Sequence, residues 1–487
     1  MKFTRMLSLL LCLVMALTLL VACTDGGRDD VTTDNGDVTQ APDESTTVEA
    51  TETVDPTASA LPDRVFNDVF RLFTWSNQTV YEFDSDSESG KPIEDQIFYR
   101  KQYLKEKYGI TIALTKENGD WDHKDSFVKM VEINQNETGD NVYDSVGCYF
   151  ALSGAMSVKG LFDDLSDKEY APYIDLSKPW WPDDLLGTAK VNGAVYAATG
   201  DITPTFIRNL SICHVNLSLL KKYNPDVDVY ELVRNKEWTY EKMCELSLGK
   251  MTNTEYAITL DNNVTYDYVF YSGGFTLVEN LDDGSLKLHD FDNDERFLDF
   301  YQFAYRLLAE NSDTKIIDVQ QSFANGYSMV HLGTGDQLQR FLANVEFDYA
   351  CLPFPMYVTD NYKTQDRYYT SQTFWTTLYS ITSNCTDYEI ASFSLEALAE
   401  YGYKEMSPVW FEETFKTRYA ETPENAEMLD IIRDSVVFDA GRIFGTQIDC
   451  FSAFRQAASG NPDWVSFFSG KRGIWTERIN EINRKLG

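Results

Sequence analysis

Strand-like and helix-like patterns alternate in the first part of the folded chain. Short apolar runs predict strands over residues 69–73, 110–114 and 144–149, and helical spacing of apolar residues predicts helices over 93–108 and 126–133. Such alternation is typical of a mostly parallel sheet with helices on both faces. In such sheets, ligands bind beyond the carboxyl ends of the strands.

Later segments continue the mixed pattern. Strands are expected over residues 210–215 and 374–381, and a helix over 387–401. Asn216 and Thr239 stand where an N-cap is needed, each directly before a helix-like run. Trp75-Ser76-Asn77, by contrast, is expected to open a polar loop after the first strand.

The N-terminus has the pattern of a secreted, lipid-anchored protein. Lys2 and Arg5 precede an apolar run over residues 7–20, which is short for a membrane span and suits a signal peptide. The run ends at Leu20-Val21-Ala22-Cys23, which resembles the bacterial lipobox, whose cysteine is acylated. An ordinary secretory signal with an incidental Cys23 is the alternative.

The segment after Cys23 is predicted to be a disordered tether. It is rich in Thr, Asp, Ser, Ala and Pro, carries no aromatic residue up to Asp63, and cannot offset its ordering entropy by burial. Its eleven acidic residues against one arginine should extend it by self-repulsion. The mature protein should therefore sit on the outer face of the bacterial cell membrane.

The length of the folded part predicts two lobes, because it exceeds what one hydrophobic core usually supports. Lobe 1 is expected over residues 64–208 with a return segment over about 376–420. Lobe 2 is expected over residues 209–375 with about 421–487. The fold class is therefore α/β, with a ligand cleft between two lobes that close around the ligand.

Charge excludes several partners. The full chain has 42 basic and 77 acidic residues. The signal segment contains two basic residues, and the tether contains one basic and eleven acidic residues, so the folded part keeps 39 basic and 66 acidic residues. A net charge of −27 on the folded part argues against nucleic acid and anionic membrane surfaces, which both need a basic face.

Metal and disulfide chemistry are not expected. The four histidines are scattered without a ligand partner at suitable spacing, and the Asp-rich stretch over residues 290–294 lacks the glycine and glutamate of a calcium loop. No cofactor is expected. The six cysteines after the tether are widely spaced, and buried free thiols are the favoured interpretation, with disulfides left open.

The order of several motifs resembles one family of binding proteins. G-L-F-D-D-L at 160–165, N-G-A-V-Y-A-A-T-G-D at 192–201, the W-T pair at 238–239, and F-A-N-G-Y-S-M at 323–329 follow one another as in the extracellular solute-binding proteins of ABC importers, family 1, which includes maltose and oligosaccharide binders. Met356 stands where the family usually has a lysine. The resemblance implies a two-lobed periplasmic-binding-protein-like fold of type II, ABC permease subunits as partners, and a monomer.

Candidate ligand contacts come from strand ends, the lobe crossings and aromatic segments. Aromatic faces can cover the apolar face of a sugar ring while amides and carboxylates bind its hydroxyls. The residues nominated for a ligand are Trp75, Asn77, Tyr149, Trp180, Trp181, Asp201, Asn209, Asp336 and Trp375. Since these stretches offer no base except the nearby Arg208, a neutral sugar or oligosaccharide is the expected solute. Cationic peptides or polyamines are the competitor.

No enzyme is expected, because the short motifs of nucleophilic, metal and nucleotide chemistry are missing. A surface-anchored carbohydrate-active or glycan-adhering protein is one alternative, since a pair of catalytic carboxylates would show only in space. A ligand sensor for a membrane kinase is the other. A glycan hydrolysis assay would identify the first alternative, and neighbouring permease genes would argue against the second.

Overall fold

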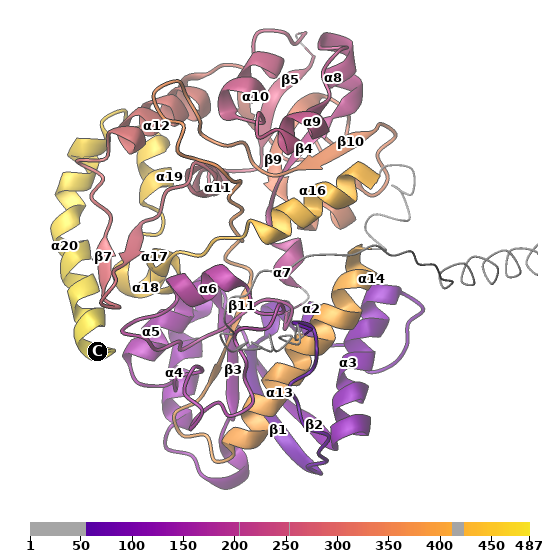
Figure 1. The fold of residues 1–487 in the computed structure, drawn as a ribbon, viewed down its shortest axis with the longest axis vertical. Helices are drawn as coiled ribbons and strands as arrows, with labels where there is room; N and C mark the ends of the chain where they lie inside the picture. The colour runs from indigo at the N-terminus through magenta and orange to yellow at the C-terminus, as the bar shows by residue number, and fades with distance from the viewer. Residues whose placement is uncertain (1–54, 204, 253, 412–422) are drawn as a thin grey trace, which may run out of the picture. The chain divides into compact units, whose positions relative to one another are not determined.

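The computed structural model describes residues 55–203, 205–252, 254–411 and 423–487. The signal peptide, Cys23 and residues 24–54 of the expected tether lie outside the described residues. Residues 55–487 form one compact unit that contains two separate main sheets. Figure 1 shows these sheets in its lower and upper parts.

The first sheet has the strand order β11-β3-β1-β2. Its strands are β1 (Asp68–Trp75), β2 (Ile110–Glu117), β3 (Ser145–Tyr149) and β11 (Thr377–Ile381). β1 pairs in parallel with both β2 and β3, which confirms the predicted parallel arrangement. β11 pairs antiparallel with β3, so a late segment of the chain returns to the edge of the first sheet.

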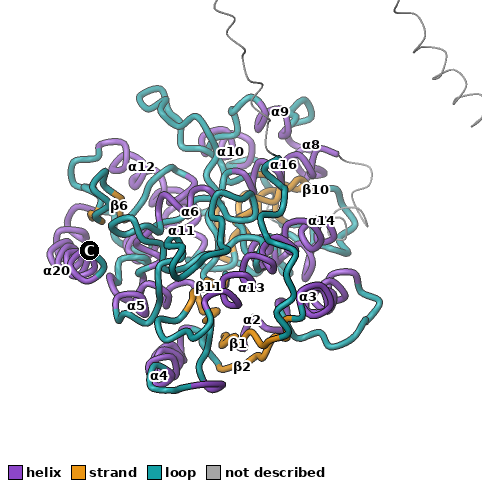
Figure 2. Tube along the Cα trace, turned by 60° about the horizontal axis from the view of Figure 1, so that its bottom comes forward, coloured by secondary structure: helices purple, strands orange, loops and turns teal. Residues whose placement is uncertain are grey.

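Helices pack around this first sheet. They are α2 (Ser76–Glu82), α3 (Pro92–Tyr108), η1 (Trp121–His123), α4 (Lys124–Asn134), η2 (Gly139–Asn141), η3 (Phe150–Leu152), α5 (Ser153–Val158), α6 (Asp183–Thr188), α7 (Thr205–Arg208), α13 (Tyr388–Tyr401), η6 (Gly402–Met406) and α14 (Ser407–Phe411). α13 contacts β1 and β11 while α3 contacts β2, and the two helices lie beside each other over the sheet (Figure 2). α3 ends at Gly109, whose φ of 69° suits glycine at a helix C-terminus.

The expected polar loop after the first strand is a helix instead. α2 begins directly after Trp75, and its inward side chains include Gln78, Thr79 and Glu82. Glu82 is fully buried and accepts hydrogen bonds from Thr377 Oγ1 at 2.7 Å and Tyr379 OH at 2.8 Å. Polar contacts to the distant strand β11 therefore hold a short helix whose own sequence lacks apolar periodicity.

The second sheet has the order β10-β4-β9-β5-β8. Its strands are β4 (Ser211–Asn216), β5 (Tyr256–Leu260), β8 (Thr314–Ile316), β9 (Ser328–Thr334) and β10 (Tyr349–Leu352). The elements around it are α8 (Leu217–Tyr223), α9 (Val229–Arg234), α10 (Tyr240–Ser247), α11 (Thr265–Ser272), α12 (Glu295–Tyr305), η4 (Arg306–Glu310), η5 (Leu338–Leu342) and α16 (Pro423–Asp434). The predicted N-caps are confirmed, because the side chains of Asn216 and Thr239 accept backbone N–H groups of α8 and α10.

Three chain segments cross between the two sheets side by side. Leu210 bridges Gln372, and Thr370 bridges Val436. The Ser211 N–H donates to the Ser371 carbonyl at 2.9 Å. Hydrogen-bonded crossings of this kind fit the predicted two-lobed α/β fold, which the architecture confirms.

The C-terminal segment contacts both halves. It contains α17 (Ala440–Ile443), α18 (Gly445–Ile448), α19 (Ala453–Ala458) and α20 (Trp464–Lys485), and α20 runs beside the small ribbon of β6 (Val278–Asn280) and β7 (Leu286–Leu288) (Figure 1). α18 contacts α5 of the first half, whereas α19 contacts α11 of the second. The segment placed wholly in lobe 2 from the sequence thus bridges the two.

Residues 55–63, placed in the expected tether, lie against the folded body. Lys178 Nζ donates to the Ala58 carbonyl at 2.8 Å, and the Ser59 hydroxyl donates to Glu400 at 2.6 Å. Among the helices that the structure describes, none has the length and apolar character needed to cross a bilayer.

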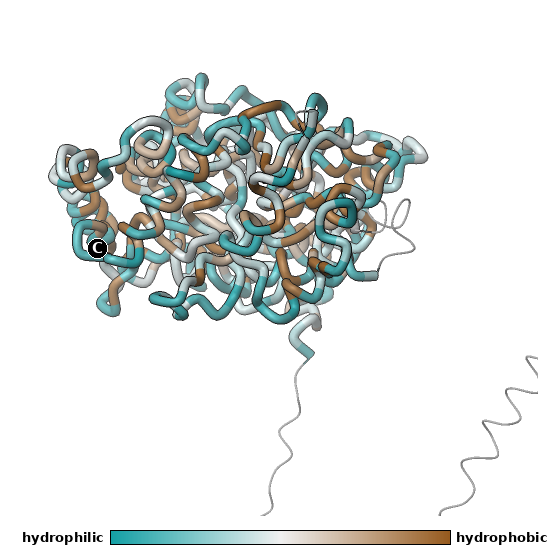
Figure 3. Tube along the Cα trace, turned by 90° about the horizontal axis from the view of Figure 1, so that it is seen from above, coloured by the Kyte–Doolittle hydropathy of each residue, from teal (hydrophilic) through white to brown (hydrophobic). Residues whose placement is uncertain are grey.

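Burial follows the hydrophobic pattern. Hydrophobic stretches of the trace lie mostly inside and hydrophilic stretches mostly at the periphery (Figure 3). All six cysteines after the tether are free thiols, and five of them are buried, which confirms the favoured interpretation. Cys148, Cys213 and Cys351 sit in strands with fully buried side chains.

Candidate ligand-binding site

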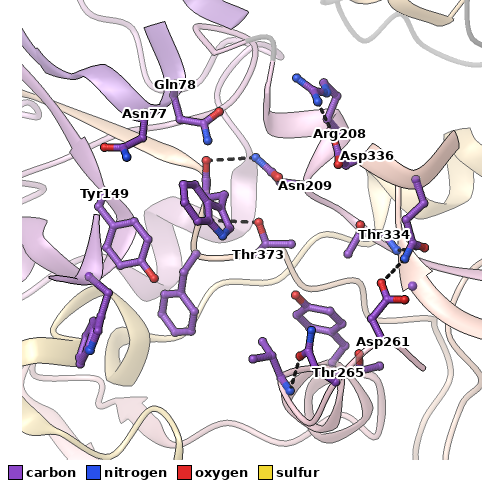
Figure 4. Close-up of a pocket in the computed structure, with 18 of the residues that line it drawn as sticks. Asn77, Gln78, Tyr149, Arg208, Asn209, Asp261, Thr265, Thr334, Asp336 and Thr373 are labelled. Carbon is purple, nitrogen blue, oxygen red and sulfur yellow. Dashed lines mark hydrogen bonds and ion pairs between the residues drawn. The ribbon is translucent and has the colours of Figure 1, made fainter. Parts of the chain in front are cut away.

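A cavity of about 630 Å³ lies between the two sheets (Figure 4). Its size falls in the range usual for small-molecule sites. Both halves and the C-terminal segment contribute side chains. The lining residues are Asn77, Gln78, Tyr81, Trp121, Tyr149, Arg208, Asn209, Asp261, Asn262, Val264, Thr265, Tyr268, Gly333, Thr334, Asp336, Gln337, Arg340, Thr373, Phe374, Trp375, Phe451 and Arg455.

Strand ends position much of this lining. Asn77 follows the carboxyl end of β1, and Tyr149 is the last residue of β3. Asp261 follows β5, and Thr334 is the last residue of β9 in the second sheet. The cavity therefore lies at the carboxyl ends of parallel strands from both sheets, where α/β folds place their ligands.

Three aromatic side chains of the cavity retain large exposed surfaces. Trp375 is 46% exposed, Trp121 41% and Tyr81 37%. The Trp375 ring stacks on Trp75 with centroids 5.7 Å apart and planes 22° apart. Trp75 itself is fully buried, and its indole N–H donates to Thr377 Oγ1 at 2.9 Å. Trp75 thus supports the ring of Trp375 from behind, and Trp375 offers the open face.

Further rings continue from Trp375 along one wall. Tyr149 lies 6.3 Å from Trp375 and 6.1 Å from Phe374, and Phe374 lies 5.1 Å from Phe451. Phe451 meets Trp121 edge to face at 5.4 Å. These centroid distances describe one aromatic wall that connects the two exposed tryptophans and can cover apolar faces of a ligand.

Amide side chains face the same cavity and are already oriented. Asn77 Oδ1 accepts the Gly119 N–H at 3.1 Å, so its amide group has a defined direction. Asn209 Nδ2 donates to the Trp375 carbonyl at 3.1 Å, which ties this crossing residue to the tryptophan (Figure 4). Oriented amides add donors and acceptors that can bind ligand hydroxyls.

Three arginines also line the cavity, which corrects the expectation that it offers no base beyond the nearby Arg208. Arg208 forms an ion pair with Asp336, and Arg340 donates to the same carboxylate at 2.8 Å. Arg208 also stacks 3.7 Å from the centre of the Tyr81 ring. Since the arginines come from three separate helical elements, α7, η5 and α19, only the tertiary structure brings them together.

Arg455 is paired from behind the cavity wall. Its Nη1 donates to Asp267 Oδ2 at 2.8 Å. Burial raises the pKa of Asp267 to about 7, although Arg455 and Arg442 oppose this rise. Each cavity arginine thus has a carboxylate partner: Arg208 and Arg340 share Asp336, and Arg455 pairs with Asp267.

Five of the nine nominated ligand residues line the cavity: Asn77, Tyr149, Asn209, Asp336 and Trp375. Trp180 and Trp181 do not, and the structure corrects their expected position. Both rings are buried, and their indole N–H groups donate to Glu396 at 2.9 and 3.0 Å. The buried carboxyl group of Glu396 thus accepts both indole N–H groups in the core of the first half.

Asp201 also lies away from the cavity. It is buried, accepts the hydroxyl of Ser407, and pairs with Arg433 Nη2 at 2.8 Å. Its charge is therefore used to join α14 to α16. Trp75, the remaining nominee, lies behind Trp375 as described above.

Sequence reasoning missed Tyr81, Trp121, Asp261 and Arg455. Asp261 directly follows an apolar strand, so the rule that nominated Tyr149 would also have selected it. Trp121 begins η1, the short helix that follows β2 at the same edge of the first sheet. Arg455 had no such signal, because the position of the C-terminal segment depends on packing.

In the part of the chain that the structure describes, no cluster of three or more His, Cys, Asp or Glu side chains could hold a metal ion.

Solved structures with a similar fold include proteins named as solute- or substrate-binding proteins of ABC transporters. An ABC transporter solute-binding protein from Thermotoga lettingae bound with alpha-D-tagatose is 15% identical, covers 86% of this chain and 100% of its own, and has a TM-score of 0.51. UgpB from Mycobacterium tuberculosis in complex with glycerophosphocholine is 14% identical with a TM-score of 0.55, over 84% of this chain and 98% of its own.

A third such structure is an ABC substrate-binding protein from Listeria monocytogenes in complex with cycloalternan. It is 13% identical over 86% of this chain and 99% of its own, with a TM-score of 0.51. No protein-family model matches the chain, and no curated protein matches it in sequence. The likeness is therefore one of fold, and the chain has the two-lobed fold of the solute-binding proteins of ABC transporters.

Proposed function

We propose that this protein captures a solute outside the cell and delivers it to an ABC importer, without a chemical step of its own. The observation that carries the proposal is the cavity between the two halves, lined by exposed aromatic faces and oriented amides at the strand ends. The fold supports it, because solved proteins with this fold are bound to small solutes.

The proposed solute is a neutral sugar or short oligosaccharide. Trp375 and Trp121 offer open ring faces suited to the apolar side of a sugar ring. The cavity arginines pair with Asp336 and Asp267, which occupy part of their donor capacity, and their remaining N–H groups can donate to ligand hydroxyls. Tagatose and cycloalternan in two neighbours of the same fold are in line with this class.

The proposal includes a membrane anchor. Cys23 is proposed as the lipidated residue on the basis of the residues before it, and acyl chains would hold the protein at the outer face of the cell membrane. ABC permease subunits are the proposed partners. A monomer is the proposed form of the protein.

Thermal unfolding of the purified full-length protein tests the proposal. Neutral oligosaccharides and cationic peptides are added separately, and a solute at a hundred times its dissociation constant should add about 2.7 kcal/mol of stability. Titration calorimetry then measures affinity for the sugars that respond. Tight binding of a peptide with no response to any sugar would overturn the sugar assignment.

A further inference from the structure

Asp261 reaches the cavity wall from the end of β5 and is held from behind by two buried groups. Its Oδ1 accepts the Val319 N–H at 2.8 Å, and its Oδ2 accepts the side-chain amide of Gln337. The Asp261 side chain is 32% exposed, while the neighbouring His331 is fully buried. Each carboxylate oxygen has two lone pairs, so both can accept a further hydrogen bond from the cavity.

The direction of the Gln337 amide follows from its partners. The Thr334 N–H, which can only donate, lies 3.2 Å from Gln337 Oε1. The amide nitrogen must therefore face Asp261 and, at 3.2 Å, His331 Nε2. An amide nitrogen only donates, so His331 Nε2 must accept.

The proton of neutral His331 is consequently on Nδ1. That nitrogen lies 3.0 Å from Thr259 Oγ1 and donates to it. The Thr259 hydroxyl donates to Ser328 Oγ at 2.8 Å, and Ser328 donates to the Val330 carbonyl at 2.8 Å. The hydrogen bonds thus run in one direction, from the Thr334 N–H through the side chains of Gln337, His331, Thr259 and Ser328 to the Val330 carbonyl.

Local packing leaves room for this arrangement at Gly333. A Cβ atom there would collide with Gln337 Oε1 and would come within 2.9 Å of His331 Cδ2. The absence of a side chain at Gly333 therefore lets the Gln337 amide lie between the histidine and the carboxylate.

A second buried histidine has the opposite tautomer. His214 Nε2 lies 3.3 Å from the Thr334 carbonyl and must donate to it, since a carbonyl only accepts. Its ring lies 6.2 Å from that of His331 at an angle of 17°. Burial lowers the pKa of His214 to about 4 and that of His331 well below its ordinary value, so both imidazoles are neutral at pH 7.

We propose that Asp261 is the specificity-determining ligand contact of the cavity and that Gln337 and His331 are the residues that hold it as an acceptor-only carboxylate. The proposal rests on the function proposed above and deepens it. A carboxylate fixed by two N–H donors binds solute hydroxyls and repels carboxylates and phosphates. It therefore selects a neutral polyhydroxylated solute over an acidic one of the same size.

Nitrogen NMR of ¹⁵N-histidine-labelled full-length protein tests the positioning residues without any solute. At pH 7 the wild-type protein should show His331 protonated on Nδ1 and His214 protonated on Nε2. Gln337→Glu places an acceptor beside His331 Nε2 and should move the proton to that nitrogen. Gln320→Glu, the same change at an exposed position, should leave both tautomers unchanged. A wild-type His331 protonated on Nε2 would refute the arrangement.

Calorimetry with named probes tests specificity. Maltotetraose, cellotetraose and xylotetraose are the neutral probes, and tetragalacturonate is the acidic one. Asp261→Asn should weaken the neutral probe that binds wild type by about 10- to 150-fold, the range for hydrogen bonds to a charged group. It should also reduce the discrimination against tetragalacturonate. Unchanged affinity would overturn the role of Asp261.

The Gln337→Glu variant adds a pH readout. At pH 7 its new carboxylate lies against Asp261, so neutral probes should bind weakly. Near pH 5, a proton shared by the two carboxyl groups restores a donor, and affinity should recover, whereas Gln320→Glu should match wild type at both pH values. An equal loss at both pH values would reduce Gln337 to a packing role. If no neutral probe binds wild type, the proposed function and the role of Asp261 both fail, while the NMR result still decides the hydrogen-bond arrangement.

Discussion

Replacing Trp375 by alanine should weaken solute binding far more than it disturbs folding. The ring is 46% exposed in the cavity and stacks on the buried Trp75. A tryptophan presents about 150–250 Å², so about 90 Å² of its surface is open to a solute. At about 25 cal/mol per Å², complete coverage would contribute about 2 kcal/mol.

That free energy sets the expected change in affinity. Coverage of the whole open surface corresponds to about a 30-fold change in Kd, and coverage of one half to about sixfold. We therefore expect Trp375→Ala to bind a solute about 6- to 30-fold more weakly. Trp375→Phe keeps an aromatic face on Trp75 and should lose less affinity for the solute than Trp375→Ala.

Trp181→Ala is the matched control for folding. Trp181 is buried and donates to Glu396, so its removal should cost about 3–5 kcal/mol of stability and leave the affinity of the folded protein unchanged. Urea denaturation measures stability, and calorimetry measures affinity under conditions where each variant is folded. Wild-type affinity of Trp375→Ala would show that the aromatic wall is not the binding surface.

Three further predictions concern pH, closure and the anchor. Burial raises the pKa of Glu396 to about 8, so the folded state holds this proton more tightly than the unfolded state. The free energy of unfolding should then fall as pH rises from about 4.5 to about 8, and Glu396→Gln should flatten this dependence in urea titrations; an equal slope in both proteins would contradict it. Small-angle scattering should show a smaller radius of gyration with a confirmed solute, because closure draws on tighter binding to the closed state, and an unchanged value would argue for a rigid site. Cys23→Ser should release the protein to the medium, and a cleaved variant that stays on the membrane would refute the anchor.

Local sequence patterns determined part of the secondary structure. The strands expected over residues 69–73, 110–114 and 210–215 are present, and Asn216 and Thr239 cap the expected helices. These features depend on residues close together in the chain, so short patterns contain the needed information. The two-lobed fold followed from their order.

The α2 helix and the tryptophans depended instead on distant partners. α2 forms because Glu82 is bound by side chains of β11, almost three hundred residues later. Trp180 and Trp181 are buried because Glu396 accepts both indole N–H groups. No short pattern distinguishes these rings from that of Trp375, since all are large apolar groups near polar residues.

The sequence by itself thus determined the strands, the caps and the strand ends at which a site belongs. The tertiary structure alone decided which side chains face the cavity, paired each arginine with a carboxylate, and brought Phe451 and Arg455 to it from the C-terminal segment. The physical reason is that a side chain's direction depends on which distant groups bury it or bind its polar atoms. Those partners are known only when segments far apart in the chain pack together.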